Sequence, residues 1–389
     1  MNQALLAALL TPLKPAAESK ELQIQEQLHS TFLCAMNSFF KQLGKTVSQR
    51  WQNQNFSPSA FPEIARLSLE EKPPFQNLDL GDFLRHFCLD DEQPFQTQST
   101  FGQPEIVVFD SPRFYIQLLF WLDGTTDVHQ HTFSGAFHVL QGSSLHSRYE
   151  FKEPEPITAH LWVGNLELKE THLLETGKTV EITSGQNFIH SLFHLDTPSI
   201  TVVIRTHNDP GTEPQFTYLP PHLAVNPLHY DALTARRKQL LDVLERANDP
   251  DYSDMVAEMI QKLDFERGFF ILQNSVGPLH DSGSWEPVWR VFERKHGRLA
   301  QFVLPSVEEI IRRDSIVALR SIFMDPQHRF FLALLLTVLN RKEFLRLIAQ
   351  RFPGKPERTL SRWISEIKDM ADEDTDWLWE AHEPLLFSK

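Results

Sequence analysis

A series of short strand-like segments between Glu105 and Thr206 constrains the fold of this chain more than any other feature. The segments alternate with turn signals, such as Gln141-Gly142 and Ser184-Gly185. We expect strands over Glu105–Phe109, Phe114–Leu122, Gly135–Leu140, Leu145–Phe151, Thr158–Gly164, Glu167–Leu174, Thr179–Ile182, Asn187–Leu195 and Ser199–Thr206. About nine short strands in roughly 100 residues predict an all-β sandwich or barrel, which hides the strand edges.

Helical patterns flank this β region on both sides. Before it, apolar residues at helical spacing predict a helix over Glu21–Leu43 that ends at Gly44, and a short helix over Asp79–Phe87. After it we expect helices over Tyr230–Ala247, Asp251–Asp264, Trp285–Gly297, Ser306–Met324, Pro326–Leu339, Arg341–Phe352 and Glu357–Met370, with 268–284 ambiguous and an acidic, loosely docked tail. The predicted division is an N-terminal segment (1–100), a β domain (101–215) and a helical domain (225–389).

Charge and composition narrow the function classes. The formal net charge is −14, and a field of that sign disfavours nucleic-acid binding. The basic residues of 341–362 are interleaved with acidic ones, which favours a solvated face over a DNA-reading unit. No apolar run reaches the roughly 18 residues that span a bilayer, and the start lacks the basic region of a signal peptide. We therefore expect a cytoplasmic protein without a membrane partner, in which Cys34 and Cys88 are reduced and buried. Homodimerisation stays open.

Two histidines at alternate positions mark a candidate metal site. His129 and His131 lie in the stretch Phe114–Gly142, and alternate side chains of a strand point to one face. Two imidazoles aimed at one point can bind a metal ion. His190, which follows a turn at Gly185, is a candidate third ligand. Taken alone, the pair is a weak signal that two surface or turn histidines would also give, so the third ligand decides between the two interpretations.

The spacing of these residues resembles the cupin superfamily. Gly124, His129, His131 and Gly142 match its first motif, and Gly185 and His190 match its second. The resemblance implies an α+β chain whose β domain is a cupin (double-stranded β-helix or jelly-roll) domain, with an N-terminal helical segment and a C-terminal all-α domain. It also implies that His129, His131 and His190 are metal ligands.

The glutamate of the first cupin motif is absent, because its position falls at Gly135 and Ala136. A three-histidine set is similar to the cysteine dioxygenase (thiol dioxygenase) branch, in which the metal is Fe(II) and the partners are a small substrate and O₂. That branch carries a serine-histidine-tyrosine set on the strand after the third ligand. Here Thr201, Val203 and Arg205 occupy the approximate positions, which indicates a substrate other than a thiol.

Strand parity nominates further residues around the site. If Ala136 faces inward, so does His138, as a core histidine or a proton relay. His146 and Arg148 share one parity, and Arg148 could anchor a substrate carboxylate. The predicted catalytic candidates are Arg148, His138, Arg205 and Tyr115. Arg113 is a weaker candidate, and His194 is either a rim histidine or a residue that orients a ligand.

Three functional hypotheses follow. The first is a mononuclear non-haem Fe(II) oxygenase or dioxygenase acting on a small polar substrate. The second is an isomerase, lyase or hydrolase that uses Zn(II), Mn(II) or Ni(II) as a Lewis acid. The third is a non-catalytic metal- or ligand-binding regulatory protein, in which the helical domain is the effector.

Overall fold

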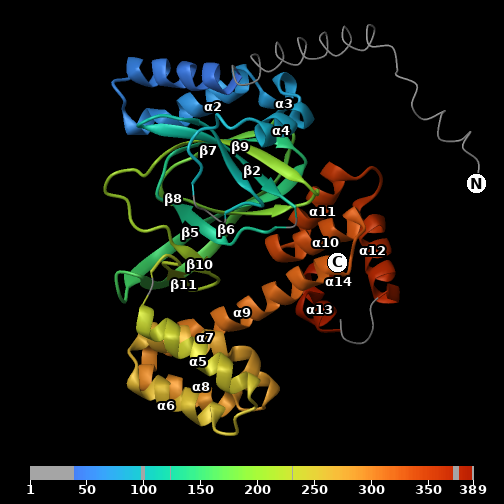
Figure 1. Cartoon of the computed structure of the whole chain (residues 1–389). Coiled ribbons are helices and arrows are strands. Elements are labelled where there is room, and N and C mark those ends of the chain that lie inside the picture. Colours follow the sequence, from blue (N-terminus) through green and yellow to red (C-terminus); the bar gives the residue numbers. More distant parts are fainter. Residues whose placement is uncertain (1–38, 98–100, 123, 230, 371–375, 388–389) are drawn as a thin grey trace, which may run out of the picture.

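The computed structural model describes residues 39–97, 101–122, 124–229, 231–370 and 376–387. A central β domain is covered by helices at its N-terminal side and joined to a larger helical region (Figure 1). Cys34 and most of the helix predicted over Glu21–Leu43 lie outside the described residues. Among the described residues, no helix combines the length and the apolar character that a membrane span requires.

The N-terminal helices cover one face of the β domain. The described part of the first helix, residues 39–53, continues through Gly44, so the predicted stop there is wrong. A Cβ at Gly44 would lie 2.5 Å from the Phe109 ring, and the glycine is needed for this close approach rather than for a helix end. The helix is followed by η1 (Pro58–Ala60), α2 (Phe61–Glu71), α3 (Pro74–Asn77) and α4 (Leu80–Leu89). Cys88 on α4 is exposed, contrary to expectation.

The β domain has eleven strands in the described residues, arranged in two sheets. They are β1 (Glu105–Asp110), β2 (Phe114–Trp121), β3 (Val128–His131), β4 (Gly135–Gln141), β5 (Ser143–Pro156), β6 (Leu161–Glu175), β7 (Thr179–Ile182), β8 (Gly185–His194), β9 (Ser199–Thr206), β10 (Thr217–Leu219) and β11 (Leu223–Val225). One sheet has the order β1-β2-β9-β4-β7, and the other closes in the order β10-β11-β6-β5-β8-β3.

This strand order confirms the predicted fold class. Most successive strands between β2 and β9 alternate between the two sheets, which is the connectivity of a jelly roll. Three details differ from expectation. Strand β3 is not among the predicted strand segments. The segments predicted over Thr158–Gly164 and Glu167–Leu174 are one long strand, β6, because the irregularity in its pairing with β5 is absorbed by bulges rather than by a turn. The short strands β10 and β11, three residues each, extend the barrel beyond residue 215.

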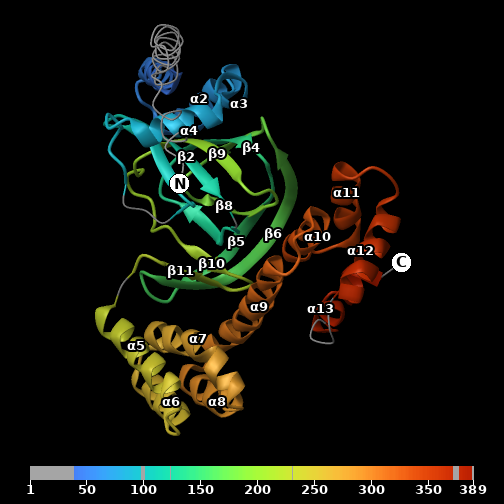
Figure 2. The ribbon, with the colours of Figure 1, turned by 45° about the vertical axis from the view of Figure 1, so that its right-hand side comes forward.

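The C-terminal region is helical, as predicted. Its helices are α5 (Ala232–Arg246), α6 (Tyr252–Lys262), α7 (Phe265–Asp281), α8 (Trp285–His296), α9 (Ala300–Ala318), α10 (Pro326–Thr337), α11 (Arg341–Arg351), α12 (Pro356–Met370), α13 (Asp376–Ala381) and α14 (Glu383–Phe387), with η2 (Gly297–Leu299) and η3 (Leu319–Ser321) around α9. The long α9 connects the α5–α8 group to the α10–α14 group (Figure 2). The ambiguous segment 268–284 is largely helix α7, whose first turn is capped by Asp264.

The tail is more tightly packed than the sequence indicates. Trp379, Leu385 and Leu386 are buried in the same apolar cluster as Phe330–Leu336 of α10. That cluster also contains Leu145 of β5 and Phe193 of β8, so the α10 group is anchored on the barrel. The description of the tail as loosely docked is therefore wrong for its described residues. Burial of several large apolar side chains, each stabilising by about 1.5–3 kcal/mol, outweighs the acidic composition.

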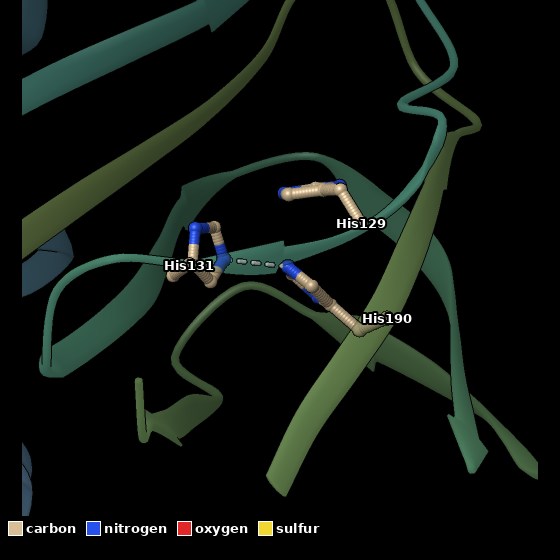
Figure 3. Close-up of side chains that lie close together, drawn as sticks. All are labelled: His129, His131 and His190. Atoms are coloured by element: carbon tan, nitrogen blue, oxygen red, sulfur yellow. Dashed lines mark hydrogen bonds between the residues drawn. The ribbon is translucent and has the colours of Figure 1, made fainter. Parts of the chain in front are cut away.

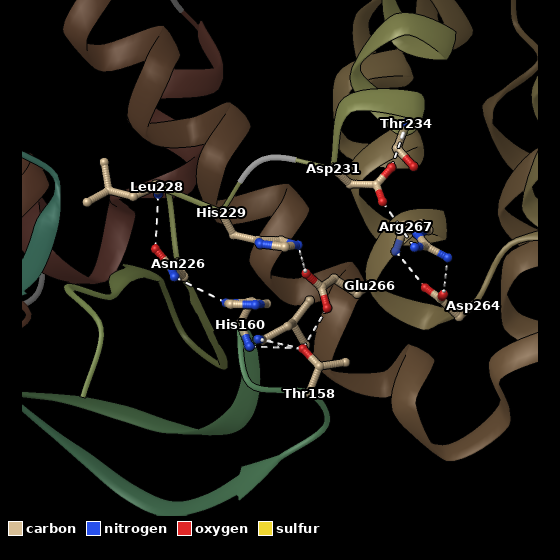
Figure 4. A network of polar contacts seen from close by, with 11 residues as sticks. Thr158, His160, Asn226, Leu228, His229, Asp231, Thr234, Asp264, Glu266 and Arg267 are labelled. Carbon is tan, nitrogen blue, oxygen red and sulfur yellow. Dashed lines mark hydrogen bonds and ion pairs between the residues drawn. The ribbon is translucent and has the colours of Figure 1, made fainter.

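Polar contacts fix both helical groups to the barrel. Arg320 on η3 is buried and donates hydrogen bonds to the carbonyl oxygens of Gly124 and His194, at 3.1 and 2.9 Å. At the other group, the His160 and His229 rings stack at 3.6 Å, and Glu266 of α7 accepts from the Thr158 hydroxyl at 2.6 Å (Figure 4). The contact of Arg320 with Gly124 fixes the loop directly before β3, the strand that carries His129 and His131.

Candidate metal centre

Three histidine side chains converge inside the barrel, from two paired strands. His129 and His131 lie on β3 and point to the same face, as their alternate positions predict. His190 lies on β8, and its Cα is the direct partner of His129 in the β3–β8 pairing. All three are buried, with exposed fractions of 3–5%. Figure 3 shows the three rings turned toward one another from the two strands.

The ring nitrogens of this triad fit a metal ion. One nitrogen from each ring lies within 4.8 Å of the others. His131 Nε2 and His190 Nε2 are 2.9 Å apart, and His129 Nε2 is buried with no hydrogen-bond partner among the described residues. A buried nitrogen without a partner is costly, and an ion that accepts three lone pairs would remove that cost. The donor set therefore suits a divalent metal such as iron or zinc.

Contacts on the far side of the rings orient two of the ligands. His129 Nδ1 donates to the backbone carbonyl of Asp127 at 2.8 Å, which leaves the lone pair of Nε2 toward the centre of the triad. His190 Nδ1 lies 3.0 Å from His146 Nε2. His146 is itself buried, on β5, and does not line the cavity. Such partners fix the ring orientation and tautomer of a metal ligand.

Burial keeps the triad neutral. It lowers the pKa of His129, and it lowers the pKa values of His131 and His190 well below the ordinary value. The neighbouring rings, and Arg205 in the case of His131, lower the pKa values further because a second positive charge is disfavoured nearby. Neutral imidazole is the form that binds metals, so the site needs no proton release before an ion binds.

A cavity of about 530 Å³ opens in front of the triad. Half of its lining residues are aromatic or aliphatic, and the β2 and β9 strands of the opposite sheet contribute Tyr115, Gln117, Thr201 and Arg205. The lining residues are Thr97, Phe101, Glu105, Tyr115, Gln117, Leu119, Trp121, Thr126, His129, His131, Phe133, Phe137, Ile182, His190, Leu192, Thr201, Val203, Arg205, Gln215 and Leu228. Leu228 is 79% exposed, which places it at the mouth rather than on the floor. The volume suits a small-molecule ligand.

Two of the predicted catalytic candidates line this cavity. Tyr115 and Arg205 are direct partners in the β2–β9 pairing, so their side chains lie side by side at one end. Thr201 and Val203 line it as well, at alternate positions of β9. The three positions at which the resemblance placed a serine-histidine-tyrosine set thus face the cavity with different side chains.

The parity expected for β4 is wrong. Phe137 lines the cavity, whereas Ala136 packs in the cluster formed with the N-terminal helices. His138 shares that outward face, where it stacks on Phe75 at 5.7 Å and its Nδ1 lies 2.8 Å from the Thr179 hydroxyl. Burial lowers the pKa of His138 to about 4. The strand is covered on both faces, so its apolar pattern could not show which residues point inward.

Arg148 and His194 lie near the triad without lining the cavity. Arg148 is the β5 partner of His190, but its guanidinium lies over the Phe188 ring at 3.8 Å and donates to the carbonyl oxygen of Asn187. His194 stacks on Trp121 at 4.5 Å, and its Nδ1 lies 2.9 Å from the Ser144 hydroxyl. Neither residue contacts a ring of the triad through a hydrogen bond among the described residues. Arg113 is exposed and stacks on Phe56.

Several cavity residues carried no functional prediction. Gln117 is a lone polar residue in the otherwise apolar strand β2, and this interruption was a usable signal. Phe101, at the rim, contacts the His129 ring edge-on at a centroid distance of 5.9 Å. Its position before β1 gave no signal, because only the tertiary fold brings it to the cavity mouth.

No protein-family model and no curated protein sequence matches this chain. Solved structures that resemble it include a cupin-2 domain protein from Shewanella frigidimarina, at 14% identity and a TM-score of 0.20, covering 32% of this chain and 92% of that one. Another is hydroquinone 1,2-dioxygenase from Sphingomonas sp. TTNP3, at 8% identity and a TM-score of 0.22, covering 28% and 68%. A structure of DMSP lyases matches at 16% identity and a TM-score of 0.24, covering 39% and 74%.

The strand order of this chain itself makes the β domain a jelly roll. The three structures cover between 28% and 39% of this chain. The strand order and the position of the histidine triad are features of this chain itself.

Proposed function

We propose that this protein is a mononuclear non-haem Fe(II) oxygenase that acts on a small substrate bound in front of the triad His129, His131 and His190. The observation that supports the proposal is the convergence of three buried, neutral imidazoles on a closed-in cavity, with no carboxylate among them. Neutral ligands leave the full positive charge of a divalent ion for substrate and O₂, and histidine suits iron as well as zinc. Such an ion would supply O₂ activation and Lewis acidity at the triad.

The residues of the chain would perform the remaining tasks. The triad would hold the ion, and His146 and the Asp127 carbonyl would keep two of its rings in the binding orientation. Trp121, Phe137 and Leu192 would exclude water from the reacting atoms. Thr201, Val203 and Arg205 stand where a thiol dioxygenase carries its polar set, so we propose a substrate other than cysteine.

Anaerobic loading with Fe(II), followed by metal analysis and an O₂-uptake screen, tests the proposal. We expect one iron per chain and substrate-dependent uptake that is lost in a His131→Ala variant. Activity that is retained with Zn(II) or Mn(II) and needs no O₂ would instead support a Lewis-acid enzyme. Failure to bind any divalent metal would overturn the proposal in both forms.

A further inference from the structure

The Arg205 guanidinium lies in the cavity without a carboxylate partner. Among the described residues it forms no ion pair within 4.0 Å, and its hydrogen bonds go from Nε to the Thr206 carbonyl at 3.3 Å and from Nη2 to the His207 carbonyl at 3.1 Å. A guanidinium has five N–H donors, so three remain, including both on Nη1. Burial lowers the pKa of Arg205, and the nearby charges of Glu105 and Asp209 offset only part of this, without forming an ion pair. A partly buried cation without a direct ion-pair partner points to an anion that is brought by a ligand.

Two aromatic rings fix this guanidinium in place. Its central carbon lies 3.4 Å from the centroid of the Phe133 ring and 5.0 Å from that of Tyr115. Cation–π contacts of this kind hold the plane of the guanidinium while its edge stays available. Gly135 allows β4 to approach at this point, because a Cβ there would lie 2.0 Å from the Ile204 carbonyl oxygen. The anchor is therefore positioned before any ligand binds.

Arg205 is also close to the triad. The Phe133 ring that contacts Arg205 also contacts His131, at a centroid distance of 4.4 Å. All three side chains line the same cavity, so a single small molecule there can reach both the cation and a residue of the triad. Between the two ends, Gln117 and Thr201 line the wall, and their side chains make no hydrogen bond among the described residues. They can serve hydroxyl or carbonyl groups of a ligand.

The remaining walls and charges define the class of ligand further. Leu119, Trp121, Phe137 and Leu192 form an apolar enclosure that suits an aromatic or branched aliphatic body. Arg205 is the only lysine or arginine among the lining residues. Glu105, on the neighbouring strand β1, also lines the cavity, and its charge acts on Arg205. An acidic side chain in the same cavity disfavours a second negative charge on the ligand.

We propose that the substrate is a monocarboxylate with an apolar body, whose carboxylate is bound by the free edge of Arg205 while the body faces the histidine triad. That the ligand is a substrate rests on the proposed function, whereas its binding at Arg205 is argued from the cavity alone. Two parallel N–H groups match two carboxylate oxygens. A phosphate dianion would be only half compensated by one guanidinium, so we favour the carboxylate.

Titration calorimetry with phenylacetate and its neutral analogue phenylacetamide tests the inference on the full chain, both metal-free and Co(II)-loaded. We expect phenylacetate to bind the metal-free protein roughly tenfold or more tightly than the amide, the range of a charge-assisted bidentate pair. Arg205→Gln removes this preference, and Arg205→Lys retains part of it because a point charge cannot form the fork. Arg113→Gln, which alters an exposed arginine outside the cavity, leaves it unchanged.

The comparison of the two ligands in the wild-type protein needs no variant. It therefore tests the inference even if the Arg205→Gln chain misfolds. Equal binding of acid and amide, or a preference that survives Arg205→Gln, would overturn it. Tighter binding of phenylphosphonate than of phenylacetate would overturn the choice of a carboxylate. Carboxylate preference in a protein that retains no metal would refute the proposed function while leaving the anion site standing.

Discussion

The described part of the barrel holds two kinds of buried histidine, and their difference identifies the site. His138 and His194 are isolated: each places Nδ1 against a hydroxyl and stacks its ring on an aromatic side chain. His129, His131 and His190 converge on one another. Nitrogens without a partner occur in both groups, including the Nε2 atoms of His138 and His194. An unpartnered buried nitrogen by itself therefore does not indicate a metal site. The convergence of several ring nitrogens on one point does.

Removal of a converging histidine should give the largest difference between the two groups. In His131→Ala we expect the affinity for Fe(II) or Co(II) to fall by more than about 100-fold, beyond the effect of losing an outer partner. The reason is that two imidazoles cannot enclose the ion as three do. Equilibrium dialysis with metal analysis measures it. The matched control, His138→Ala, removes an isolated buried histidine and should bind metal as the wild type does; similar losses in both variants would erase the distinction.

His146 stands between the two groups, because it is buried beside the triad but contacts only one ligand. His146→Ala should weaken metal binding by roughly 10–100-fold, since His190 loses the partner that orients its ring. His146→Gln retains a hydrogen-bonding group and should recover part of the affinity. The d–d spectrum of bound Co(II) checks whether the ligand geometry changes. An unchanged affinity and spectrum in His146→Ala would show that the 3.0 Å contact has no positioning role.

The isolated histidines should make the folded protein sensitive to acid. Burial lowers the pKa of His138 to about 4 and that of His194 to about 3, below the ordinary value near 6.5 in the unfolded chain. The unfolded state therefore binds more protons as the pH falls below about 6.5, and the free energy of unfolding decreases from there toward pH 4. Urea titrations at pH 7, 6 and 5 measure the decline. A free energy of unfolding that stays level over this range would contradict the neutral burial of both residues.

The smallest expected effect concerns stability alone. His138→Phe removes the hydrogen bond to Thr179 and keeps the ring stacked on Phe75, so we expect a loss of about 1 kcal/mol in the free energy of unfolding. Thermal and urea unfolding at pH 7 provide the measurement. Metal content should stay at the wild-type level. A drop in metal content with unchanged stability would place His138 in the functional site after all.

Much of the site could be predicted from local sequence. The two-residue spacing of His129 and His131 places both rings on one face of a strand wherever that strand lies, since side chains alternate. The resemblance to cupins supplied the third ligand, His190, and the same resemblance indicated that Thr201, Val203 and Arg205 share a face. The strand series and its turns predicted the barrel itself, apart from the four-residue strand β3 and the three-residue strands β10 and β11, which are too short to show a period.

Only the tertiary structure decided which side of β4 faces the cavity. The N-terminal helices cover Ala136 and His138 on one face of the strand, and Phe137 on the other face lines the cavity. Because both faces are buried, the sequence pattern does not show which face points to the cavity. The same holds for the lack of an ion pair at Arg205 among the described residues, which depends on the side chains that neighbouring strands place beside it. Local sequence determines the spacing of side chains along a strand, whereas the packing of distant segments determines which of them meet.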